Sequence, residues 1–197
     1  MDVLRKVFQP FDDGFIFKWI VVVLFVLSAL AAILNALALD YGLLRYLAEA
    51  KFLTGVAMLV LAGAMLLASL AQALILLYRG AWEVLCLKAE RYSLVRLFSK
   101  ALRVIGEAYF LFFVVIAPGG CLAVWLGGTE LLGQVPIPGL REASGAFMGG
   151  LLVLVLGILL AAAQLFVAYF LAEVVELVAS IANDVAALRK AREQAGT

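Results

Sequence analysis

The stretch AFMGGLLVLVLGILLAAAQLFVAYFLA, residues 146–172, contains no charged side chain. A helix needs about 20 apolar residues to cross the roughly 30 Å hydrocarbon layer of a bilayer, and this stretch is longer than that. Three further apolar runs of sufficient length precede it, at residues 15–38, 52–78 and 104–126. Because these runs are continuous rather than alternating, they exclude a barrel and predict four membrane-spanning helices.

The composition of the whole chain agrees with this prediction. Hydrophobic residues make up 66% of the sequence, charged residues only 15%, and the mean hydropathy is +1.13. These values lie far from the average of soluble globular proteins and are typical of an integral membrane protein. The 197 residues leave room for one transmembrane domain, residues 1–197, without a separate soluble domain. The first apolar run is much longer than the core of a signal peptide, so we expect an uncleaved anchor.

Lys and Arg residues are distributed unequally between the connections, which predicts the topology. Only Arg45, Lys51 and Arg141 fall in the connections after the first and third runs. The other Lys and Arg residues lie in the N-terminal segment, the connection between the second and third runs, and the C-terminal tail. By the positive-inside rule, both termini are expected in the cytoplasm, in a multi-pass protein of the inner (cytoplasmic) membrane.

The central connection is predicted to contain an amphipathic helix over residues 83–103. Its apolar side chains fall on one face, and the opposite face carries basic residues that we expect to contact anionic lipid headgroups: Lys88, Arg91, Arg96, Lys100 and Arg103. Topology and anchoring explain this pattern without a dedicated lipid site. Glu107 lies one turn beyond Arg103, so an i,i+4 ion pair explains its presence at the start of the third span. A functional acid at Glu107 is the alternative.

Few residues within the spans are polar, and two glutamines follow stripes of small residues. Ala64 and Ala68 lead to Gln72 in the second span, whereas the fourth span carries a similar stripe: Gly157, Ala161, Gln164, Ala168 and Ala172. Small residues allow close helix approach, so both stripes are interpreted as packing seams. A polar path between Gln72 and Gln164 is the alternative. Pro118 lies in the third span, where we expect a kink or a local break.

The tail continues the apolar pattern of the fourth span. Apolar residues alternate at steps of four and three, a heptad seam that includes Val174, Val178, Ile181, Val185 and Leu188. Residues 173–197 are therefore predicted to extend the last span as a cytoplasmic helix. The seam either packs against residues 83–103 of the same chain, with Glu173 and Glu176 pairing with basic residues there, or associates with another chain.

Missing residue types limit the chemistry. The sequence has no histidine, the commonest general base and a frequent ligand of zinc and haem. Cys86 and Cys121 fall in different compartments of the predicted topology and are not expected to form a disulfide. Nucleotide, hydrolase and metalloprotease motifs are absent from the sequence. We therefore expect no catalytic residues, cofactor or metal, and no nucleic-acid partner.

The predicted fold is all-α: an integral membrane four-helix bundle of two in-out-in helical hairpins, with an interfacial amphipathic helix and a helical C-terminal extension. The function expected from these features is that of a non-enzymatic structural or accessory subunit, or scaffold, with homo- or hetero-oligomeric membrane partners. The alternative is a small oligomeric channel or transporter that uses the third span around Pro118 and the polar residues of the second and fourth spans.

Overall fold

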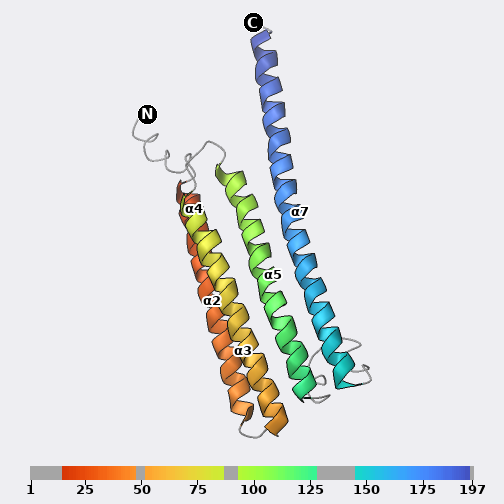
Figure 1. Ribbon diagram of the computed structural model, residues 1–197. Helices are drawn as coiled ribbons and strands as arrows, with labels where there is room; N and C mark the ends of the chain where they lie inside the picture. Colours follow the sequence, from red (N-terminus) through yellow and green to blue (C-terminus); the bar gives the residue numbers. More distant parts are fainter. Residues whose placement is uncertain (1–14, 48–51, 87–92, 128–144, 196–197) are drawn as a thin grey trace.

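The computed structural model describes residues 15–47, 52–86, 93–127 and 145–195, and no strand occurs among them. The long helices are α2 (Phe15–Leu47), α3 (Phe52–Ile75), α5 (Ser93–Gly127) and α7 (Ala146–Ala195) (Figure 1). A π-helical segment, η1 (Leu76–Trp82), and the short α4 (Glu83–Cys86) continue α3 to Cys86. Within the described ranges, four helical segments are long and apolar enough to cross a membrane, which indicates a membrane protein.

The long helices pack in the order α2, α3, α5, α7. The helix α5 lies between α3 and α7, and it makes the most extensive contacts with both neighbours (Figure 1). The helix α2 packs mainly on α3 and η1, and touches α5 only slightly. The N-terminal part of α7 is aligned with the other helices, and its C-terminal part extends beyond them (Figure 1).

Small residues lie at several of the contacts that α5 makes with α3 and α7. A side chain added at Gly119 of α5 would overlap Ala64 of α3, and one added at Gly106 would overlap Ala168 of α7. A Cβ added at Gly157 of α7 would lie 2.5 Å from the Cβ of Ala117 in α5. Ala64 of one stripe and Gly157 and Ala168 of the other therefore pack against α5 rather than against each other.

Side-chain size separates the inside of the protein from its surface. The buried apolar residues are mostly alanines, whereas most of the leucines and phenylalanines among the described residues are exposed. A soluble protein would lose the hydrophobic contribution of these exposed side chains. In a bilayer the lipid tails cover them, and small residues at the contacts let the helix backbones approach. The packing thus agrees with the assignment of four candidate spans.

Two expectations about α5 differ from the structure. In place of a separate interfacial helix over 83–103, residues 93–103 are the first turns of α5, which continues into the third span. Residues 83–86 form α4, and the residues between α4 and α5 lie outside those described. No proline or other helix breaker separates residue 93 from the span, so nothing ends the helix there. Of the kink or local break expected at Pro118, the break is not found, because α5 continues through this residue; the kink stays a prediction.

Candidate functional site

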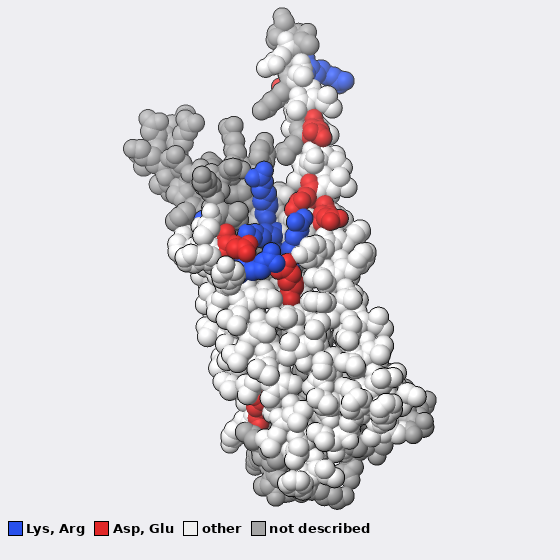
Figure 2. All heavy atoms as spheres, viewed as in Figure 1, with Lys and Arg blue, Asp and Glu red and all other residues white. Residues whose placement is uncertain are grey.

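A network of charged side chains lies at one end of the span region, between η1, α4, α5 and α7. Figure 2 shows these charges gathered in one zone, below which the visible described surface is almost entirely uncharged. Arg79 of η1 donates a hydrogen bond to Glu107 of α5 and forms a 3.3 Å ion pair with Glu83. Lys100 lies 2.8 Å from the other carboxylate oxygen of Glu83. The hydroxyl of Tyr169 on α7 donates to Glu107 over 2.7 Å.

Arg103 is the second centre of this network and connects α5 to α7. Its guanidinium lies 3.1 Å from Glu176 and 5.7 Å from the centre of the Tyr169 ring. The hydroxyl of Ser99 donates to the same oxygen of Glu176. The expected i,i+4 pair of Arg103 with Glu107 is wrong, because each of these residues has its partners on other helices. Close packing of α5 against α7 supplies a nearer acid to Arg103. The pairing of Glu176 with the basic segment is confirmed.

The basic residues expected to contact lipid headgroups therefore have different surroundings. Lys100 and Arg103 pair with acids of the same chain, which explains both without a lipid. Arg96 is exposed and has an interaction within the chain. Lys88 and Arg91 lie outside the described residues. Contact of this segment with anionic headgroups stays a prediction.

The structure does not bring Gln72 and Gln164 together. Gln72 of α3 is buried and lines a pocket between α2, α3 and α5. Gln164 is exposed on α7, a helix that contributes no residue to this pocket. The pattern placed Gln164 in the small-residue stripe, but Leu165 takes that place against Gly106 of α5. A polar path joining the two glutamines has no support within the described residues.

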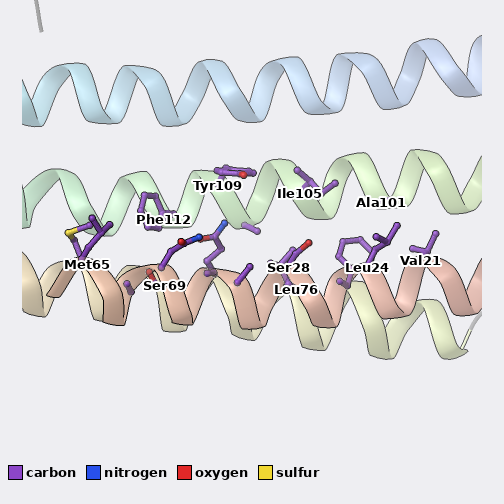
Figure 3. A pocket seen from close by; sticks show the side chains of 18 of the residues that line it. Val21, Leu24, Ser28, Met65, Ser69, Leu76, Ala101, Ile105, Tyr109 and Phe112 are labelled. Carbon is purple, nitrogen blue, oxygen red and sulfur yellow. The ribbon is translucent and has the colours of Figure 1, made fainter. Parts of the chain in front are cut away.

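The pocket beside Gln72 has a volume of about 590 Å³. Figure 3 shows Tyr109, Phe112 and Ile105 of α5 across from Met65 and Ser69, with α7 on the far side of α5. Most of the lining is apolar, none of it is charged, and its polar residues come from three helices: Ser28, Asn35, Ser69, Gln72 and Tyr109. The sequence does not predict a pocket here, because neither the partner helices of α3 nor their rotation can be deduced from hydropathy.

The chain matches no known protein family, no curated protein and no solved structure. The arrangement of its own residues is therefore the basis for any functional argument. Among the described residues, no group of three or more His, Cys, Asp or Glu side chains could hold a metal ion. Cys86 is exposed and Cys121 is buried, and both are free.

Asp40 is a candidate residue that was not predicted from the sequence. We ended the first span at Ala38, whereas α2 continues to Leu47 and makes Asp40 part of the helix. Asp40 is 5% exposed, and neither carboxylate oxygen has a hydrogen-bond partner. An acidic group buried among apolar helices is costly and is frequently functional in membrane proteins. Its position within a run of apolar residues, NALALDYGLL, was the available signal.

The predicted association seam is exposed on α7. Val174 is 37% exposed, and exposure rises to 60% at Val178 and 71% at Leu188. Ile181 and Val185 are exposed as well. Packing of this seam against residues 83–103, one of the two alternatives, is therefore not found in the part of the chain that the structure describes. Association with another chain, the other alternative, stays a prediction.

Proposed function

We propose that the chain is a non-enzymatic structural or accessory subunit of a membrane assembly, which it joins through the C-terminal part of α7. The observation that carries this proposal is the exposed seam from Val178 to Leu188, beyond the charged network. Exposed apolar residues inside a bilayer need no explanation, because lipid covers them. Beyond the charged network, water would cover them, and burial against protein is more favourable.

The length of α7 supports this placement. Its 50 residues correspond to about 75 Å at 1.5 Å per residue, more than twice the roughly 30 Å hydrocarbon thickness. Glu176 pairs with Arg103 in the charged network, so the residues from Leu177 onward lie beyond that level (Figures 1 and 2). The distribution of Lys and Arg in the sequence supports a cytoplasmic position of this end, with both termini inside and the chain in the inner membrane.

The charges beside the seam favour a second copy of the chain as the partner. With Val178 and Val185 at heptad positions a, and Ile181 and Leu188 at positions d, Asp184 falls at g and Arg189 at e. In a parallel coiled coil, g of one helix faces e of the other five residues later, so Asp184 would face Arg189 of the second copy. Two copies inserted in one membrane with the same topology are parallel, as this pairing requires.

The test is the mass of the full chain extracted from its native membrane in a mild detergent. We expect an oligomer for the natural sequence and for Ala187→Asp, a change at heptad position c, on the exposed side of α7 away from the seam. Val185→Asp should give monomers, because two buried aspartates would face each other. A charge exchange sharpens the test: Asp184→Arg should weaken association, and adding Arg189→Asp should restore it.

A monomeric natural chain, or equal association of Val185→Asp and Ala187→Asp, would contradict the proposal. If the oligomer is unaffected by the charge exchange and contains a second protein, the chain joins a heteromeric assembly instead of associating with itself. The channel or transporter alternative has weaker support, since Gln72 and Gln164 belong to different surfaces and α5 is unbroken at Pro118.

A further inference from the structure

The pocket between α2, α3 and α5 has the size and shape of a ligand site. Its volume of about 590 Å³ falls within the roughly 300–1,000 Å³ of small-molecule pockets. The helix α3 packs on both neighbours, whereas α2 and α5 hardly touch, which leaves space between these two helices. Exposed lining residues, Leu24 and Leu39 of α2 and Phe98 of α5, border this space. A molecule dissolved in the bilayer can therefore enter from the side.

The polar residues of the pocket indicate what it binds. Gln72 is 9% exposed and lines the pocket. An amide without a partner in an apolar environment is unfavourable, and lipid tails cannot provide one. A ligand with a hydrogen-bonding group next to Gln72 would satisfy it. Asn35 and Ser69 line the same pocket and provide further hydrogen-bonding groups.

We propose that this pocket binds an uncharged amphiphile whose carbonyl or hydroxyl head lies beside Gln72 and whose apolar chain lies along α2 and α5. No lining residue carries a charge, and an ionised head at this depth would lose its hydration without gaining a counter-charge. Diacylglycerols and isoprenoid quinones share this head-group chemistry. Phospholipids do not, because their charged phosphate stays at the bilayer surface.

Competition photocrosslinking of the full chain in phosphatidylcholine nanodiscs tests the proposal. The labelled probe is a diazirine-bearing diacylglycerol, and the competitors are dioctanoylglycerol, a decyl-substituted benzoquinone and dioctanoyl phosphatidic acid. We expect crosslinks on the lining residues of α2, α3 or α5. At least one uncharged competitor should remove them, at concentrations tenfold or more below those needed with phosphatidic acid. The competitor that acts at the lower concentration identifies a glycerolipid or a quinone as the natural class.

Two glutamines provide a matched pair of variants. Gln72→Leu should weaken binding of the uncharged competitor at least tenfold, because it removes the hydrogen-bonding group while keeping the side-chain bulk. Gln164→Leu, the same change on the exposed face of α7, should stay within twofold of the natural chain. Ala32→Phe, which fills the pocket from α2, should abolish specific crosslinking.

Three results would overturn the proposal. Equal binding by Gln72→Leu and the natural chain would show that the pocket accepts any acyl chain and does not recognise the head group. Competition by phosphatidic acid as strong as that by the uncharged lipids would contradict the choice of an uncharged head. Crosslinks that no competitor removes would show that the pocket has no specific ligand of this class. None of these measurements depends on the oligomeric state, so they are independent of the proposed assembly function.

Discussion

The contact between α5 and α7 predicts a large effect of one added methyl group. A Cβ at position 157 would lie 2.5 Å from that of Ala117, whereas carbon atoms in contact are about 3.5–4.0 Å apart. The two helices must therefore separate by about 1.0–1.5 Å in Gly157→Ala. Overpacking of this kind costs about 1–3 kcal/mol, and the better helix propensity of alanine offsets only about 0.5–1 kcal/mol of it.

Gly63 of α3 is the matched control, because a Cβ added there meets no atom within 4 Å. Gly63→Ala should gain the propensity term alone, so the two variants should differ by about 1–3 kcal/mol, the size of the clash. The assay is unfolding of the full chain in mixed micelles, followed by tryptophan fluorescence. Adding Ala117→Gly to Gly157→Ala should return most of the loss. Equal stability of Gly157→Ala and Gly63→Ala, or no recovery with Ala117→Gly, would refute the close contact.

Two further predictions concern buried or partly buried polar groups. Glu107→Leu should destabilise the protein more than Tyr169→Phe, since it removes the partners of both Arg79 and Tyr169, while Tyr169→Phe removes one hydrogen bond worth about 0.5–1.5 kcal/mol. Equal losses in the same unfolding assay would contradict the network. Asp40→Leu should stabilise the protein by about 1–3 kcal/mol, because Asp40 is buried without a hydrogen-bond partner. A lower melting temperature than that of the natural chain would show that Asp40 has a stabilising role.

The sequence was sufficient to predict the candidate membrane-spanning helices, but it predicted only part of how these helices pack. Hydropathy is a property of each residue and needs no knowledge of the fold, so apolar runs can be found from the sequence alone. The runs at 15–38 and 146–172 lie within α2 and α7. Lipid and protein interior are equally apolar, and hydropathy therefore does not say which face of a span is buried. The small-residue stripes gave that information in part: they predicted seams at Gly157 and Ala64, but not that both seams contact α5.

The polar groups were harder to interpret than the spans. A partner four residues away is visible in a sequence, so Arg103 was assigned to Glu107, whereas the structure pairs these residues with Glu176 and Arg79. Partners on different helices depend on the rotation and depth of each helix. The pocket beside Gln72 could not be predicted for the same reason, because its lining comes from α2, α3 and α5. Asp40 was missed because the first span was ended too early.

The helix α7, which carries the association seam, and the pocket lie on different sides of α5. We therefore predict that association and ligand binding are independent. The helix α7 contacts the face of α5 that carries Gly106, and it lies beyond α5 when seen from the pocket (Figure 3). Val185→Asp should therefore abolish association while leaving competition by the uncharged lipid within twofold. Ala32→Phe should abolish specific crosslinking while leaving the oligomeric mass unchanged. Loss of both properties in either variant would instead mean that α5 transmits a change between its two faces, so that ligand and assembly are coupled.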